Sequence, residues 1–107
     1  MHIRETDVDE RLDLLENVEN GEIFLYDGKV NMNRFQNKTV AKILQNAETR
    51  HALIIFSESV PSRSAKRIAT RIGKTIERFE REIEIDIFFE VPRELFDLIR
   101  TECTTNC

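Results

Sequence analysis

An apolar run followed by an amphipathic pattern in the middle of the chain predicts a buried strand and a long helix. Residues 52–56 (ALIIF) are continuously apolar and rich in β-branched side chains, which is typical of a strand buried on both faces. Pro61 disfavours helix at the residue before it, and we expect Ser62 to cap a helix that starts near Arg63 and runs to about residue 82. Apolar residues recur along this helix at spacings of three and four, which predicts one buried face. Its members are Ala65, Ile68, Ala69, Ile72, Ile76, Phe79 and Ile83.

Two further strands are predicted on either side of this pair. Residues 22–26 form a short apolar run that ends at Asp27-Gly28, a dipeptide typical of tight turns. Residues 29–32 then form either a short hairpin arm or a loop. In residues 83–91, apolar residues alternate with mostly acidic ones, which predicts a strand with one solvated face. We expect this strand at an edge of the sheet, where outward acids discourage aggregation.

Helices are predicted around these strands from apolar residues at helical spacing. The first covers residues 7–18, within an N-terminal helical segment assigned to residues 1–20. The second is capped by either Asn31 or Asn33 and turns Val40, Ile43 and Leu44 inward. A last helix is expected over residues 92–101, because Pro92 fits the first turn of a helix.

This order of elements predicts one α/β domain over residues 1–107. Its centre is a βαβαβ core, residues 22–91, forming a small open sheet of three strands, or of four if residues 29–32 pair. Helices flank the core at both ends, and residues 102–107 form a flexible polar tail. Phe88 would lie either beneath the last helix or at the surface, where a homodimer would bury it.

Composition and residue pattern exclude several classes of protein. No apolar run approaches the roughly 20 residues that span a bilayer, and the N-terminus lacks an apolar signal-peptide region, so we expect no membrane association and a cytoplasmic location. Cys103 and Cys107 lie together in the polar tail, whereas His2 and His51 are far apart and follow no ligand spacing. We therefore expect no metal and no cofactor.

Positive charge is concentrated in the middle of an acidic chain. The formal charge is -4, yet residues 28–81 carry twelve Lys or Arg against four Asp or Glu. Cations follow the predicted long helix at steps of three and four, opposite its apolar face. They form either a solvated surface, partly neutralised by Glu77, Glu80 and Glu82, or a track for phosphates. The stripe comprises Arg63, Arg67, Arg71, Lys74, Arg78 and Arg81, and the predicted nucleic-acid contacts are Lys29, Arg63, Arg67, Arg71, Lys74 and Arg78.

A serine-rich turn joins the central strand to the long helix. The carboxyl end of a strand that meets a helix N-terminus is where open α/β sheets bind anions, so a small phosphorylated ligand could bind here. The turn lacks the glycines and lysine of a P-loop. A serine nucleophile is not supported, because His51 lies at the other end of the strand, roughly 15–20 Å from Ser57. The predicted anion ligands are Ser57, Ser59, Ser62, Arg63 and Ser64.

The elements predicted between residues 22 and 91 follow a recognisable order. A strand ends in Asp27-Gly28-Lys29, and a helix and a buried strand come next. A second helix then begins with residues 59–65 (SVPSRSA). This order, with its glycine-lysine loop and its basic, serine-containing turn, resembles the Alba family of archaeal chromatin and RNA-binding proteins. The family usually has a second lysine in the loop, a glycine-arginine pair in the turn and a closing β-hairpin, whereas this chain has Val30, Pro61-Ser62 and a predicted helix. The resemblance implies a βαβαβ fold and binding to DNA or RNA.

Two hypotheses of different classes follow from these patterns. The first is a small non-catalytic nucleic-acid-binding protein that neutralises phosphates through a basic helix face, so that its affinity falls steeply with salt. The second is a regulatory or protein–protein interaction module without catalytic activity, which binds an acidic partner. An enzyme ranks third, because Glu58 is the only acid near the serine-rich turn and a lone loop glutamate is usually solvated.

Overall fold

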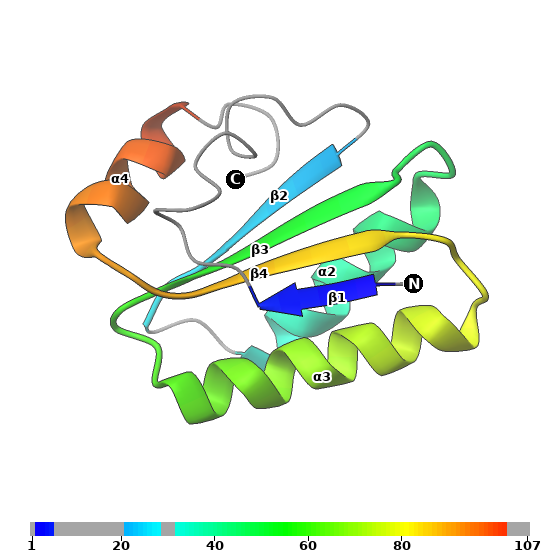
Figure 1. Cartoon of the computed structure of the whole chain (residues 1–107), viewed down its shortest axis with the longest axis horizontal. Helices are drawn as coiled ribbons and strands as arrows, with labels where there is room; N and C mark the ends of the chain where they lie inside the picture. Colours follow the sequence, from blue (N-terminus) through cyan, green and yellow to red (C-terminus); the bar gives the residue numbers. More distant parts are fainter. Residues whose placement is uncertain (1, 6–20, 29–31, 103–107) are drawn as a thin grey trace.

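A four-stranded parallel sheet with helices on both faces forms the protein (Figure 1). The computed structural model describes residues 2–5, 21–28 and 32–102. The predicted helix over residues 7–18 and the residues from Cys103 onward lie outside this part of the chain. The elements are β1 (His2–Glu5), β2 (Gly21–Tyr26), α2 (Met32–Gln45), β3 (His51–Ser57), α3 (Ser62–Arg78), β4 (Glu84–Val91) and α4 (Arg93–Glu102).

The βαβαβ core predicted for residues 22–91 is confirmed: β2, α2, β3, α3 and β4 follow one another, and neighbouring strands of this core are parallel. The last helix is confirmed as well, with a shift of one residue. Met32 opens α2 and is therefore not part of a hairpin arm, and residues 29–31 lie outside the described chain. None of the described helices is long and apolar enough to cross a bilayer.

The position predicted for β4 is wrong, because this strand lies inside the sheet. The strand order is β1-β4-β3-β2, and β1 pairs with β4 in parallel, so that Ile3 lies opposite Ile85. The fourth strand of the sheet is therefore β1, and the helical assignment of residues 1–20 is wrong over residues 2–5. Its sequence, HIRE, is only four residues long and gives no clear alternation, so the sequence did not predict a strand there.

The larger apolar core lies between the sheet and the helices α2 and α3 (Figure 1). Phe56 of β3 is at its centre, with the ring of Tyr26 at a centroid distance of 4.9 Å and that of Phe89 stacked at 5.7 Å. Ring pairs at such separations add to the free energy of burial. The face of α3 that contributes to this core comprises Ala65, Ile68, Ala69, Ile72, Gly73 and Ile76.

A second, smaller core lies beneath α4 on the opposite face of the sheet. Phe88 is buried there beside Phe96, which confirms the alternative that placed it under the last helix. A homodimer was expected only if Phe88 lay at the surface. Because Phe88 is buried within the chain, this reason for a homodimer no longer applies. The other members are Leu53, Ile55 and Val91, with Ile23, Leu25, Leu95 and Ile99 partly buried around them.

A bulge in β4 explains why simple alternation did not predict its two faces. Two residues of β4 lie between Phe88 and Val91, while their partners Ile55 and Ser57 on β3 are separated by one. Glu90 takes up the extra residue with a left-handed φ of 51°. Val91 consequently packs in the same core as Phe88 rather than on the opposite face.

The face of β4 predicted to be solvated is exposed at Glu84 and Glu90 but buried at Asp86 and Phe88. Asp86 is fully buried, and its carboxylate pairs with the imidazole of His51, which is 14% exposed. A buried carboxylate needs such a partner, because desolvation strongly disfavours an isolated charge. His51, which follows no motif in the sequence, thus forms a hydrogen bond with the buried Asp86 across two strands.

Candidate functional site

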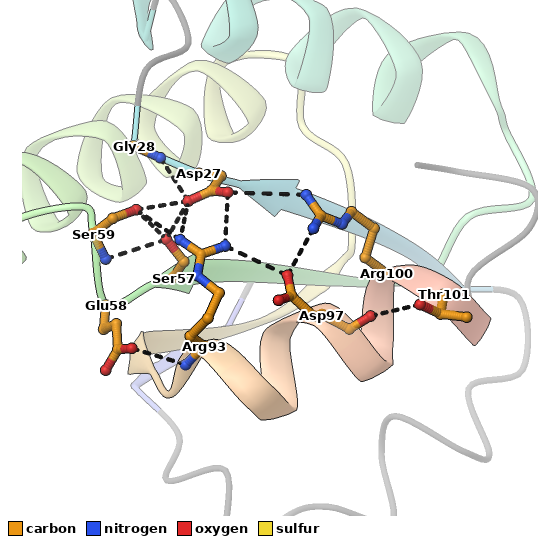
Figure 2. Close-up of polar contacts among 9 residues, drawn as sticks. All are labelled: Asp27, Gly28, Ser57, Glu58, Ser59, Arg93, Asp97, Arg100 and Thr101. Carbon is orange, nitrogen blue, oxygen red and sulfur yellow. Dashed lines mark hydrogen bonds and ion pairs between the residues drawn. The ribbon is translucent and has the colours of Figure 1, made fainter.

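Polar side chains converge where three neighbouring parallel strands end (Figure 2). Asp27 directly follows β2, Ser57 is the last residue of β3, and Arg93 opens α4 after β4. Ser59 joins them from the turn between β3 and α3. The carboxyl edge of a parallel sheet is the usual place for a functional site in α/β proteins. We call Asp27, Ser57, Ser59 and Arg93 the carboxyl-edge cluster.

The carboxylate of Asp27 is the centre of this cluster. It accepts hydrogen bonds from the hydroxyls of Ser57 (2.7 Å) and Ser59 (2.6 Å) and from the backbone N–H of Gly28 (2.8 Å). Arg93 donates to both carboxylate oxygens, at 2.9 and 2.8 Å, in the bidentate arrangement that a planar guanidinium favours. The cluster therefore joins β2, β3 and α4 through one acceptor group.

Hydrogen bonding strongly lowers the pKa of this carboxyl group. Donation from Arg93, followed by that from Ser59, holds the pKa of Asp27 far below its usual range. The same pairing raises the pKa of Arg93 above its already high ordinary value. Asp27 is consequently a very weak base, because a carboxylate that holds its charge so firmly does not take up a proton near neutral pH.

Helix α4 supplies further charge around the cluster. Arg100 lies 3.9 Å from the carboxylate of Asp27 and donates to Asp97 at 2.7 Å. Both arginines also lie over the ring of Phe96, at 5.5 Å for Arg93 and 5.8 Å for Arg100. The backbone N–H of Arg93 donates to Glu58 at 3.0 Å, so that a carboxylate satisfies the first turn of α4.

The predicted anion ligands do not form a single group. Ser57 and Ser59 donate to Asp27, while Ser62 donates to Glu90. The predicted helix cap at Ser62 is therefore wrong: Pro61 precedes the helix and makes no side-chain cap. Arg63 is exposed and Ser64 is half-buried on the first turn of α3. An external anion at the serines would have to displace the chain's own carboxylates.

The cluster lacks a partner that could activate a serine. His51 and His2 both belong to the amino ends of their strands, in register with Glu84, whereas the serines lie at the carboxyl end. Within the described residues, no group of three or more His, Cys, Asp or Glu could hold a metal ion. The arrangement is suited to holding three elements together rather than to proton transfer.

The exposed surface of α3 carries the predicted phosphate contacts. The predicted Lys and Arg contacts on this helix, spaced three or four residues apart, are all exposed. No acidic residue of the described chain forms an ion pair with them. Glu77 and Glu80, which could have neutralised them, form no ion pair with these cations among the described residues. Lys29 lies outside the described residues. We call Arg63, Arg67, Arg71, Lys74 and Arg78 the cationic face of α3.

Arg81 was predicted to continue this face, and that prediction is wrong. Its guanidinium turns toward α2 instead, where it donates to four backbone carbonyls at 3.0 to 3.4 Å. These carbonyls lie at and just after the end of α2, where helix carbonyls lack intrahelical partners. The acceptors are those of Ile43, Leu44, Asn46 and Thr49.

The end of α3 also differs from the prediction. The helix stops at Arg78, and Phe79, expected to face the core, is 60% exposed. Glu80 follows with a left-handed φ of 55°, which turns the chain toward β4. Ile83 is buried beyond this turn, outside the helix. An aromatic ring therefore lies at the surface where the cationic face ends.

A groove of about 490 Å³ borders the cationic face of α3 on the side toward β1, and Lys74 lines it. Ala69, Gly73 and Phe89 form part of its apolar lining, while Lys66 and Glu77 contribute opposite charges. Lys66 lies over the ring of Phe89 at 5.9 Å. The mixture of charges does not single out one class of ligand.

Comparisons of the chain with protein-family models, with curated proteins and with solved structures give no match. The function is therefore argued from the residues themselves. The sequence analysis did not predict that Asp27 pairs with Arg93, or that Asp97 and Arg100 lie beside this pair. The available signal was that Asp27 and Arg93 come directly after predicted strands, so that the carboxyl edge of a parallel sheet brings them together.

Proposed function

We propose that the protein binds nucleic acid through the cationic face of α3, by contacts to phosphates and without reading bases. The observation that carries this proposal is that five exposed cations lie on one helix and form no ion pair with the described acidic residues. Arginine and lysine in such an array replace the counterions of a phosphate backbone, and the release of those ions drives binding.

The spacing of these cations suits an extended polyanion. The helix has 17 residues, which corresponds to roughly 25 Å at about 1.5 Å per residue. Successive cations lie three or four residues apart, so each is displaced from the next by about 4.5 to 6 Å along the axis. Burial of the opposite face of α3 in the larger core holds the array in one orientation.

The net negative charge of the protein does not oppose this proposal. Electrostatic interactions at physiological salt are screened beyond about 8 Å, so the charges nearest to the phosphates determine local affinity. Helix α3 carries six Lys or Arg and the single acid Glu77. Acidic residues elsewhere would reduce long-range attraction at low salt more than they reduce contact affinity.

Two expectations from the sequence belong to the same proposal. The resemblance of residues 22–91 to the Alba family points to the same class of ligand, DNA or RNA. A cytoplasmic location is part of the proposal as well. The hydroxyls of the carboxyl-edge cluster have no part in it, because they donate to Asp27.

A salt titration with a matched pair of variants tests the proposal. Binding of labelled duplex DNA, single-stranded DNA and RNA is measured by fluorescence polarisation at several salt concentrations. The first variant is Arg67→Glu with Arg71→Glu on α3. The matched control is Lys38→Glu with Lys42→Glu on α2, which has the same change in charge, the same spacing of four residues and equally exposed side chains.

We expect the α3 variant to lose affinity on the order of tenfold or more and to show a salt slope smaller by about two, because two phosphate contacts are lost. The α2 control should keep the wild-type slope. Circular dichroism confirms that both variants are folded. An equal loss in both variants would overturn the assignment to α3. No binding to any nucleic acid at low salt would overturn the function itself and favour an acidic protein partner.

A further inference from the structure

We infer that the nucleic acid bound by this surface is single-stranded, with one base stacked on the exposed ring of Phe79. The inference rests on the function proposed above and names the class of its ligand. Phe79 directly follows Arg78, the last residue of the cationic face of α3. A phosphate track that ends at an exposed aromatic ring is the combination by which proteins hold single strands without sequence preference.

The ring of Phe79 belongs to a well-anchored turn. Its backbone N–H donates to Ile76 at 3.0 Å, and that of Glu80 donates to Glu77 at 3.0 Å. Two residues further on, Arg81 is fixed by four carbonyls at the end of α2. The segment is therefore held on both sides of the ring. A preordered aromatic surface loses little conformational entropy when a base stacks on it.

Burial in the protein's own core does not account for Phe79. Its side chain is 60% exposed. By contrast, Ile72 and Ile76, which precede it in the same helical pattern of apolar residues, are fully buried. Exposure of a large ring to water is unfavourable, at roughly 25 cal/mol per Å² of apolar surface. A base would cover this ring in the complex.

Stacking selects single strands over duplexes. In a duplex the faces of the bases are already stacked on their neighbours, so a ring at the protein surface meets only the backbone and the base edges. A single strand can present an open base face while its phosphates follow the cations. Phe79 should therefore add to the affinity for single-stranded DNA or RNA and add nothing for duplexes.

Substitution of Phe79 tests the inference. Fluorescence polarisation compares Phe79→Ala with the wild-type protein on single-stranded and duplex oligonucleotides of equal length. We expect a loss of about 5- to 150-fold for the single strand, the range found for one stacked base, and an unchanged affinity for the duplex. The matched control is Leu98→Ala, which removes another exposed apolar side chain, 55% exposed, from α4; it should change neither affinity.

A crosslink locates the contact independently of affinity. Single strands that carry 4-thiouridine are irradiated with the protein, and the modified peptide is identified by mass spectrometry. Attachment at Phe79 supports the inference, whereas attachment only at other segments overturns it. Sedimentation velocity of Phe79→Ala should match the wild type, and a change in oligomeric state would show that the ring binds a second copy instead.

The possible failures are distinguishable. If single strands and duplexes both bind and Phe79→Ala affects neither, the phosphate function stands and the stacking inference is overturned. A higher affinity for duplexes than for single strands overturns it as well. If no nucleic acid binds to the wild-type protein, both proposals fall together.

Discussion

Arg93, at the first position of α4, donates to both carboxylate oxygens of Asp27, at the end of β2. The two residues belong to elements separated by two helices and two strands in the chain, and their pairing closes the carboxyl edge of the sheet. Ser57 and Ser59 complete the shell of donors around the same carboxylate. Docking of α4 over the smaller core thus depends partly on one acidic residue.

Asp27→Ala should lower the free energy of unfolding by about 1 to 3 kcal/mol, because the hydroxyl of the fully buried Ser57 loses its carboxylate acceptor. Chemical denaturation measures the change. Asp97→Ala is the control: Asp97 pairs with the same arginines but lies on α4 itself and at 43% exposure, so its effect should stay below about 1 kcal/mol. Equal effects of the two substitutions would contradict the role given to Asp27.

Acid should remove the contribution of Asp27 to the free energy of unfolding. Because its folded-state pKa is depressed, its contribution is fully present above the unfolded pKa of about 4 and is lost as pH falls below that value. The difference in stability between the wild type and Asp27→Asn should therefore shrink in acid. A difference that stays constant from neutral pH into strong acid would contradict the depressed pKa.

Gly28→Ala should destabilise the turn after β2. An added Cβ would lie 2.7 Å from Oγ and 3.0 Å from Cβ of Ser59, so that Ser59 must move away from Asp27. We expect a loss of about 1 to 3 kcal/mol, as for other insertions into a packed site. In a Ser59→Gly background the same substitution should cost much less. A double-mutant cycle measures this coupling, and additive effects would argue against the contact.

Tyr26 should titrate well above an ordinary tyrosine. Burial raises its pKa to about 12, against the opposing effect of the hydrogen bond with Thr39. As Tyr26 is the only tyrosine and the chain has no tryptophan, the ultraviolet absorbance of phenolate reports this residue alone. We expect a midpoint near 12 in the folded protein and near 10 after denaturation.

The raised pKa of Tyr26 makes the protein less stable at high pH. As pH rises, Tyr26 loses its proton at a lower pH in the unfolded state than in the folded state. Its contribution to the free energy of unfolding is therefore fully present below about pH 10 and is lost as pH rises toward 12. Tyr26→Phe should lack this alkaline loss. An ordinary midpoint near 10 in the folded protein would show that the hydroxyl reaches solvent.

Arg81→Ala should destabilise the protein by about 1 to 3 kcal/mol, because its guanidinium donates to four carbonyls at the end of α2. Arg81→Lys should recover only part of this loss, since an ammonium cannot reproduce the planar fork. Arg78→Ala, an exposed cation three residues earlier, should stay within about 0.5 kcal/mol. Thermal and chemical denaturation of the three variants compare these effects.

Local periodicity accounts for how well the core of the fold could be predicted. The apolar run at residues 52–56 and the spacing along α3 are local features, and both elements form, although α3 begins at Ser62 and ends at Arg78 rather than near residue 82. The placement of β4 depends instead on its partner β1, whose four residues carry no clear pattern. Pairing between distant segments is set by the whole fold, so local patterns do not reveal it.

The candidate site, too, could be predicted only where it depends on local sequence pattern. The cationic face of α3 follows from helical spacing and is exposed as predicted, except for Arg81, which reaches the end of α2. The carboxyl-edge cluster joins Asp27 to Arg93 across 66 residues of sequence, and no local motif marks that pairing. Phe79 was misplaced because its spacing continues the apolar face, while the helix ends one residue before it.

The parallel pairing of β1 with β4 also bears on how the chain folds. Ile3 meets Ile85, so the first strand of the sheet finds its partner only after most of the chain has been synthesised. Contacts this distant in sequence are slow to form, because a long loop must close before they contribute free energy. We therefore expect β2, β3 and the helix α2 between them to assemble first on the ribosome, with the N-terminal strand added last.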